Sequence, residues 1–303
     1  MQIPYNINNL SPLLPYPKKN AHKYSRGVVN VLAGSSKFPG AACMCANAAQ
    51  KIGAGYVRVY THDSAIPIVQ TFKPSLVVSG YKDAALVIES ARDSKYPLCN
   101  VAGPGLEPDC DVVASAILAM LNSQHPLVLD AGAFAYLENE ALRKRLVRRA
   151  RLGYLTILTP HAGEAYKIAR LLGLVATENP RELSLSISEI FGCVVVLKSH
   201  ETWVTSAKMP ENASARKSAT KGEAFEYLMK EGTPALAKAG TGDILTGIIA
   251  GLLAQNLEGE QACVLATWLH AKAAKISAEK LTEICVCPED VLDAIAQAVK
   301  SLE

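Results

Sequence analysis

Short apolar runs alternate with longer helical patterns through the first two thirds of the chain, and this alternation limits the fold more than any other feature. Several runs are apolar at every position, as strands covered on both faces require. A strand–helix–strand order predicts an α/β fold, with a mostly parallel central sheet and helices on both faces. The predicted strands are residues 28–33, 56–60, 76–79, 98–102, 127–130, 155–158 and 194–197, and the clearest helices are 41–51, 111–121, 164–172 and 181–190.

The pattern changes after residue 197. Residues 202–205 and 225–229 have the character of two strands, joined by the polar stretch 206–222. A hairpin connection of this length is unusual, and we expect a mobile loop. The last part, residues 243–302, is helical in pattern. Since no linker divides the chain, we expect one domain over residues 1–303, with 1–25 as an N-terminal extension.

Charge and hydropathy argue against several classes of protein. The 303 residues carry a formal net charge of +3, and so small an excess gives no reason to expect nucleic acid as a partner. The densest basic stretch, residues 142–151, is more typical of the solvated face of a helix, with Leu142 and Leu146 pointing inward, than of the alternative, a phosphate-binding segment. The longest apolar stretch, 244–254, is too short and too rich in glycine to cross a membrane, so we expect no membrane association.

The chain has 8 cysteines. Two pairs, Cys43/Cys45 and Cys285/Cys287, have a spacing that suits neither a zinc site nor a dithiol redox site. Most cysteines lie in apolar stretches, so we expect buried, reduced thiols. The first residues are polar and lack the apolar core of a signal peptide, which favours a cytoplasmic protein.

The segment Ala-Gly-Thr-Gly-Asp at 239–243 opens an apolar helix. Its two glycines permit left-handed dihedrals, so that successive N–H groups can point into one concavity. With the positive end of the helix dipole behind them, these donors suit a phosphate. Asp243 could be only an N-cap, but a cap needs no flanking glycines. A carboxylate beside a bound phosphate can accept the proton of an attacking hydroxyl, and we predict this role for Asp243.

With this segment the chain resembles the ribokinase-like superfamily, and within it the ADP/ATP-dependent NAD(P)H-hydrate dehydratases. The match runs in order from about residue 26 to the C-terminus. The resemblance implies a ribokinase-like α/β fold. The segments that carry it are AGSSKFPGAA at 33–42, KIGAGYVRV at 51–59, AGPGL at 102–106, VLDAGA at 128–133, TPHAGE at 159–164 and AGTGDILTGIIAGLLAQ at 239–255.

The resemblance implies an enzyme of nicotinamide nucleotide repair. The 6S hydrate of NADH or NADPH would be dehydrated with consumption of ADP or ATP and with Mg²⁺ as cofactor. The ring hydroxyl would be phosphorylated and phosphate, a better leaving group than hydroxide, would then depart. Asp243 would contact the substrate and take the hydroxyl proton, while Gly240 and Gly242 would stabilise charge on the transferred phosphoryl group. The resemblance also implies a homo-oligomer, a dimer or tetramer, and places any epimerase on a separate chain.

Other positions match the family one at a time. Ala41 would let the substrate approach closely, and Gly105 ends a predicted strand where ligand crevices of parallel sheets form. In the family the segment with His161 lines the substrate pocket, although His161 could also be a capping residue. Glu164 is either a first-turn carboxylate or a residue that helps to hold Mg²⁺ through water. Asp130 either orients the pocket or closes a turn.

The family's adenine-nucleotide segment corresponds to the residues after the predicted strand 194–197. Lys198 could alternatively be a solvated charge at the end of a strand. Nucleotide binding is implied for Lys198, Ser199, His200, Glu201, Thr202, Thr241 and Gly242.

The chain departs from the family pattern near these sites. Glu107 and Ser199 stand where glycines are expected, Ala162 stands where a proline is expected, and Thr233 where an asparagine is expected. The phosphate turn is unchanged, but nucleotide preference stays open. Two alternatives also stay open: a kinase of the same superfamily that phosphorylates a small alcohol, such as a vitamin precursor or sugar, and a non-catalytic nucleotide-binding protein.

Overall fold

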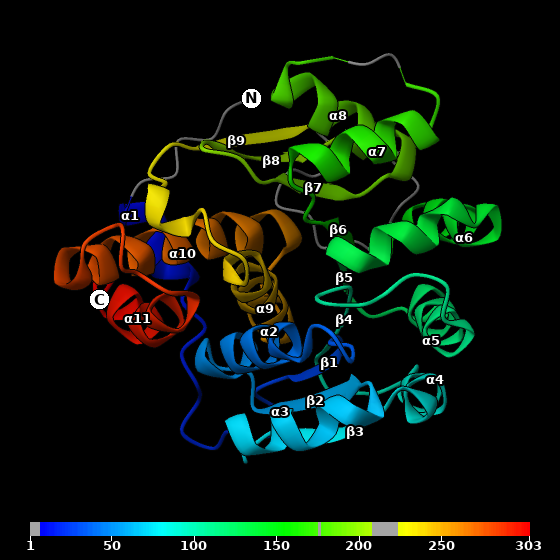
Figure 1. Cartoon of the computed structure of the whole chain (residues 1–303), viewed down its shortest axis with the longest axis horizontal. Helices are drawn as coiled ribbons and strands as arrows, with labels where there is room; N and C mark the ends of the chain where they lie inside the picture. The colour runs from blue at the N-terminus through cyan, green and yellow to red at the C-terminus, as the bar shows by residue number, and fades with distance from the viewer. Residues whose placement is uncertain (1–6, 175–176, 208–223) are drawn as a thin grey trace.

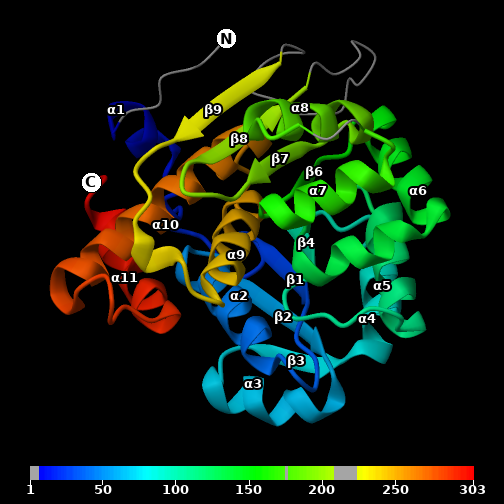
Figure 2. The same cartoon turned by 45° about the horizontal axis from the view of Figure 1, so that its top comes forward.

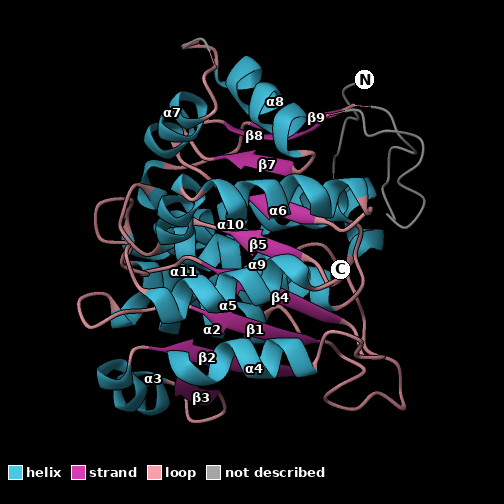
Figure 3. Ribbon diagram, turned by 90° about the vertical axis from the view of Figure 1, so that its right-hand side faces the viewer, coloured by secondary structure: helices cyan, strands magenta, loops and turns pink. Residues whose placement is uncertain are grey.

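The apolar runs form one sheet in the computed structural model, which describes residues 7–174, 177–207 and 224–303. The strand order is β3-β2-β1-β4-β5-β6-β7-β8-β9, from bottom to top in Figure 3. Strands β1 to β7 are parallel, and β8 and β9 are antiparallel to their neighbours. The strands are β1 Val28–Leu32, β2 Tyr56–Thr61, β3 Val77–Gly80, β4 Leu98–Ala102, β5 Leu127–Leu129, β6 Thr156–Leu158, β7 Val194–Leu197, β8 Thr202–Ser206 and β9 Phe225–Met229.

Helices cover both faces of this sheet, as predicted, because alternate strand residues enter two separate cores. In β2, for example, Val57 and Val59 join one core and Tyr60 joins the other. The first core is covered by α2 Pro39–Lys51, α3 Ile66–Phe72, α9 Thr241–Ala254, α10 Gly259–Leu281 and α11 Pro288–Lys300. The second is covered by α4 Tyr81–Ser90, α5 Asp111–Asn122, α6 Glu140–Arg151, α7 Ala162–Leu171 and α8 Pro180–Phe191 (Figure 1).

Short helical segments complete the chain: α1 Ile7–Leu10 and the 3-10 turns Ser11–Leu13, Asp63–Ala65, Ala131–Glu138 and Pro234–Leu236. Leu10 and Leu14, in the predicted N-terminal extension, are buried in the first core. Strands β8 and β9 pair as the predicted hairpin, and both extend toward the upper side of the view in Figure 2. Most of the loop predicted between them lies outside the described residues. None of the helices in the described ranges is long and apolar enough to cross a bilayer.

Helix α9 packs unusually closely on α2. A Cβ added at Gly247 would lie 2.1 Å from the carbonyl oxygen of Cys45, and one at Gly251 would lie 2.7 Å from that of Ala49. Each glycine costs the helix about 1 kcal/mol relative to alanine. The close packing of the two backbones, which only glycine permits, offsets this loss of helix stability.

The chain direction across the sheet reverses beside β1, which has β2 on one side and β4 on the other. Loops diverge at such a switch point, and ligand crevices of open parallel sheets form at the carboxyl ends of the strands there. The predicted site residues all lie along this edge. Ala41 and Gly105 follow β1 and β4, Asp130 follows β5, His161 follows β6, and Lys198 follows β7.

The sequence did not predict every element. Helix α4 buries only Ala84 and Ile88 along its length, which leaves too narrow an apolar stripe to be recognised. The expectation of buried thiols is correct for most cysteines but wrong for Cys285 and Cys287, which are exposed. The buried cysteines are Cys43, Cys45, Cys99, Cys193 and Cys263.

Candidate active site

A cavity of about 900 Å³ opens at the carboxyl edge of the sheet, between the end of β7, the β8–β9 pair and the start of α9. It brings together residues that are widely separated in the sequence. The sequence-predicted residues that line it are His161, Glu164, Lys198, Ser199, His200, Glu201, Thr202, Gly240, Thr241, Gly242 and Asp243.

Ala41 and Gly105 lie together at the switch point instead of lining this cavity. Gly105 has a φ of 66°, and a Cβ there would lie 2.7 Å from the Cβ of Ala41. The neighbouring Gly103 packs on Asp130, because its added Cβ would lie 1.7 Å from the Asp130 carbonyl oxygen. Asp130 lines the cavity, so the switch-point loops adjoin the cavity through this residue.

The start of α9 exposes its backbone amides to the cavity. Gly240 precedes the helix with a φ of 103°, in the left-handed region that favours glycine. The N–H groups of Gly242 and Asp243 have no acceptor among the described residues. The Thr241 hydroxyl donates to the carbonyl oxygens of Leu236 and Lys238, at 2.8 and 2.9 Å, and fixes the turn. These free donors at a helix start form a site for an anion.

Of the two glycines that permit a left-handed dihedral, only Gly240 adopts one, and Gly242 is helical. Gly242 is small for another reason. The Nζ of Lys198 lies 3.3 Å from the position that a Cβ at Gly242 would occupy. The missing side chain therefore leaves room for an ammonium group beside the amides.

Asp243 occupies the third position of α9 and is not its N-cap. Its carboxylate takes part in none of the hydrogen bonds or ion pairs formed within the described residues. Burial raises the pKa of Asp243 to about 7, with the charges of Asp130 and Glu164 adding to the effect and that of Lys198 opposing it. An unpaired carboxyl group with this pKa is suited to accept a proton near neutral pH.

A buried ion pair lies beneath Asp243. The Lys198 ammonium contacts Oδ1 of Asp130 at 2.7 Å, and the Thr246 hydroxyl donates to Oδ2 at 2.8 Å. Burial by itself lowers the pKa of Lys198, but the carboxylates of Asp130, Glu164 and Asp243 outweigh burial and raise it. Lys198 is thus a paired cation with a largely buried side chain, and the alternative of a solvated charge at a strand end is wrong.

His161 and Glu164 form a capping box at the start of α7. The His161 N–H donates to Oε2 of Glu164 at 2.8 Å, and the Glu164 N–H donates to Nδ1 of His161 at 3.3 Å. Both side chains also line the cavity. Burial raises the pKa of Glu164, while the Lys198 charge and the His161 N–H oppose this rise. The two interpretations of these residues, capping and pocket, are therefore compatible.

Two polar residues of the site were missed by the sequence analysis. Thr246 lies one turn after Asp243 and was hidden in the apolar pattern of the helix. His270, in α10, lines the cavity and is buried, and burial lowers its pKa to about 4 although the Thr241 backbone opposes this shift. It is therefore neutral at pH 7. Its surroundings in the sequence, Leu269 and Ala271, gave no sign of a polar role.

Comparison with known proteins gives consistent results. A family model for NAD(P)H-hydrate dehydratase matches residues 29–297. The bifunctional NAD(P)H-hydrate repair enzyme of Coxiella burnetii is 34% identical over 278 residues, which are 89% of this chain and 49% of that protein. The chain thus spans about half the length of this bifunctional relative.

Solved structures show the same fold. The ADP/ATP-dependent NAD(P)H-hydrate dehydratase of Bacillus subtilis, co-crystallised with ATP and Mg²⁺, superposes with a TM-score of 0.76 over 98% of each chain at 26% identity. A ribokinase-like superfamily protein of Enterococcus faecalis superposes with a TM-score of 0.79 at 24% identity, covering 99% of this chain and 96% of its own. The expected ribokinase-like α/β fold is confirmed. The chain belongs to the NAD(P)H-hydrate dehydratase family.

Proposed function

We propose that the protein dehydrates the 6S hydrate of NADH or NADPH, with ADP or ATP as phosphoryl donor. Family membership and the likeness to the Bacillus subtilis dehydratase support the proposal. The observation that carries it is the unpaired carboxylate of Asp243 beside the free amides of the first turn of α9. Transfer of a phosphoryl group to a hydroxyl requires both a base for the hydroxyl proton and donors for the phosphoryl oxygens.

Each part of the site has a place in this reaction. Asp243 accepts the proton of the ring hydroxyl while that oxygen forms a bond to phosphorus and the bond from phosphorus to the nucleotide breaks. The N–H groups of Gly240, Gly242 and Asp243 donate to the transferred phosphoryl oxygens. The phosphate then leaves the ring carbon with its bonding electrons, and loss of a ring proton restores the dihydropyridine.

Binding of the two reactants divides between the two ends of the site. We assign the nucleotide to residues 198–202 with Thr241 and Gly242, where the Lys198 ammonium adds a positive charge close to the helix start. We assign the hydrated nicotinamide to Ala41, Gly105 and His161. The reaction requires Asp243 to reach both bound groups.

The donor set fits Mg²⁺ bound mainly through water and phosphate. No group of three or more His, Cys, Asp or Glu side chains within the described ranges is arranged to hold a metal. Mg²⁺ commonly keeps several waters and is held by one or two carboxylates together with substrate phosphates. Glu164, whose carboxylate lines the cavity, can supply such a ligand, and the ion would offset negative charge on the phosphates.

We also propose that residues 1–303 form a single domain, since the nine strands of the described ranges belong to one sheet. We further propose a homo-oligomer, a dimer or tetramer, which light scattering can test.

The enzymatic proposal is tested by incubating the protein with the hydrate of NADH, Mg²⁺ and either ADP or ATP. We expect the NADH absorbance band to return, with release of phosphate, only when a nucleotide is present. If the band does not return and a vitamin-precursor alcohol is phosphorylated instead, the protein is a kinase. If nucleotide binds and neither reaction occurs, the protein is a non-catalytic nucleotide-binding protein.

A further inference from the structure

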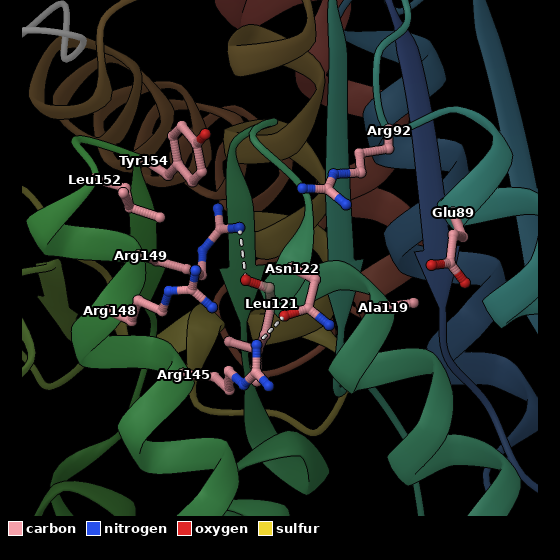
Figure 4. A pocket seen from close by; sticks show the side chains of 10 residues that line it. All are labelled: Glu89, Arg92, Ala119, Leu121, Asn122, Arg145, Arg148, Arg149, Leu152 and Tyr154. Atoms are coloured by element: carbon pink, nitrogen blue, oxygen red, sulfur yellow. Dashed lines mark hydrogen bonds between the residues drawn. The ribbon is translucent and has the colours of Figure 1, made fainter.

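A second pocket lies at the opposite, amino-terminal edge of the sheet, where α5 and α6 end and β5 and β6 begin. Its volume is about 260 Å³. Figure 4 shows four arginine side chains around it, Arg92, Arg145, Arg148 and Arg149. Among the described residues that line the pocket, Glu89 is the only acid. The lining therefore carries a clear excess of positive charge.

Arg149 supplies a buried and fixed part of this charge. Its side chain is 1% exposed, and no described carboxylate pairs with it. Burial lowers the pKa of Arg149 to about 10, so the guanidinium stays charged at neutral pH. Its N–H groups donate to the carbonyl oxygens of Met120, Leu121, Ser123, His125 and Leu155 and to the hydroxyl of Thr156.

The other arginines are positioned around this buried charge but are not neutralised. Arg145 donates from Nη1 to Oδ1 of Asn122 at 3.0 Å, which ties it to the end of α5. The backbone of Arg92 is tied by the Gln124 side chain, which donates to its carbonyl oxygen at 3.3 Å. Within the part of the chain that the structure describes, Arg92, Arg145 and Arg148 form no ion pair. The fold itself does not use these three charges.

We propose that this pocket binds a phosphate dianion, either free or as the phosphate group of a small metabolite. Planar guanidinium groups match phosphate oxygens with paired hydrogen bonds, and several of them around one recess select a doubly charged ion over chloride. The Tyr154 ring, 5.8 Å from the Arg149 guanidinium carbon, forms one wall. The sequence of residues 142–151 favours a solvated helix face over phosphate binding, and the pocket supports the second interpretation. This site does not depend on the proposed catalytic function.

The test is calorimetric titration of inorganic phosphate into three proteins at low ionic strength. The first is the wild type, and the second carries Arg92→Ala with Arg145→Ala. The third is a matched control, Lys144→Ala with Arg151→Ala, which removes two charges from α6 outside the pocket lining. Any phosphate held at the start of α9 is common to all three proteins, so the difference between them reports the second pocket.

We expect the pocket double variant to bind phosphate at least about tenfold more weakly than the wild type, and the control to change less than about twofold. If phosphate binding weakens equally in both double variants, only the overall positive charge of the surface attracts phosphate, and the proposal is overturned. Unchanged phosphate binding in both double variants would also overturn it. Urea midpoints confirm that the variants are folded. A parallel titration with glycerol phosphate separates the two sources, because tighter binding than inorganic phosphate indicates a metabolite and weaker binding indicates the free ion.

Discussion

Two cations with largely buried side chains, Lys198 and Arg149, lie at opposite edges of the sheet, and they are stabilised in different ways. At the carboxyl edge, Lys198 contacts the Asp130 carboxylate at 2.7 Å. At the amino edge, Arg149 meets only backbone carbonyls and one hydroxyl among the described residues. A buried charge needs either an opposite charge or a complete set of hydrogen bonds, and this molecule uses both solutions.

The difference matters because dipoles do not titrate and carboxylates do. Around Lys198 three acids, Asp130, Glu164 and Asp243, share one ammonium group, so the protonation of Glu164 and Asp243 depends on the charges around them. Around Arg149 the charge is fixed. At the carboxyl edge, competing carboxylates can take up or release a proton during a reaction. At the amino edge, the charge of Arg149 stays the same and contributes to stability. Substitutions at the two edges should therefore have opposite effects on activity and stability.

The largest expected effect is the loss of turnover in Asp243→Asn. A positioned general base contributes about 10²–10⁴-fold, so we expect kcat to fall by about 10³-fold while ADP binding is retained. Single-turnover kinetics and calorimetry measure the two quantities. The control is Asp111→Asn, an exposed first-turn carboxylate of α5 that should leave kcat unchanged. A variant that kept more than a tenth of wild-type turnover would rule out this base.

The second prediction concerns the amino edge. Arg149→Met leaves several buried carbonyl groups without donors, and we expect the free energy of unfolding to fall by about 3 kcal/mol. Arg151→Met, on the exposed side of the same helix, should change it by less than about 0.5 kcal/mol. Urea unfolding of both variants gives the comparison. Equal effects would mean that the bonds of Arg149 contribute little.

The third prediction is that Asp243→Asn stabilises the protein in alkaline solution. The pKa of Asp243 is raised from 3.8 to about 7 on folding, so the folded state binds more protons than the unfolded state between these values. The stability that the protonated Asp243 carboxyl group contributes to the folded state is therefore lost as the pH rises through about 7. Asparagine does not titrate, and we expect the variant to be about 2 kcal/mol more stable at pH 8, with no such gain below pH 4. Urea midpoints at the two pH values decide, and a gain that does not depend on pH would contradict the argument.

The smallest expected effect is a change in pH dependence. Asp130→Asn removes a negative charge that raises the pKa of Asp243 and frees Lys198 to attract it, so the acid limb of kcat/KM should move to lower pH. We also expect turnover above this limb to fall about tenfold, because Lys198 loses its anchor. Thr246→Val is the control, since it removes a hydrogen bond from Asp130 and keeps the charge. An acid limb that stays in place in Asp130→Asn would show that the two carboxylates do not interact.

The parts that were predictable from sequence are those governed by local pattern. Continuous apolar runs gave the strands, and the spacing of Gly240 and Asp243 gave the anion site. The contact of Lys198 with Asp130 joins residues 68 apart, and that of Thr246 with Asp130 joins residues 116 apart. Such pairs depend on the strand order, which local pattern does not contain.

Arg149 illustrates a second limit of pattern. The helical periodicity correctly turned Leu142 and Leu146 inward, and both are buried. Arg149 lies one further turn along the same face and is equally buried. A hydrophobic pattern predicts that every arginine is exposed to solvent. It contains no information on backbone carbonyl groups that can accept the hydrogen bonds of a buried guanidinium in place of water.

The tight seating of α9 on α2 has a consequence for how proteins of this kind can diversify. No side chain fits at Gly247 or Gly251, so neither helix can slide or rotate without the other. The proposed phosphate site at the start of α9 is therefore tied to the packing of the molecule's interior. The loops that follow β1 and β4 are closely packed at Gly103 and Gly105 but also carry exposed residues, and new acceptor alcohols could be acquired by changing those exposed residues alone.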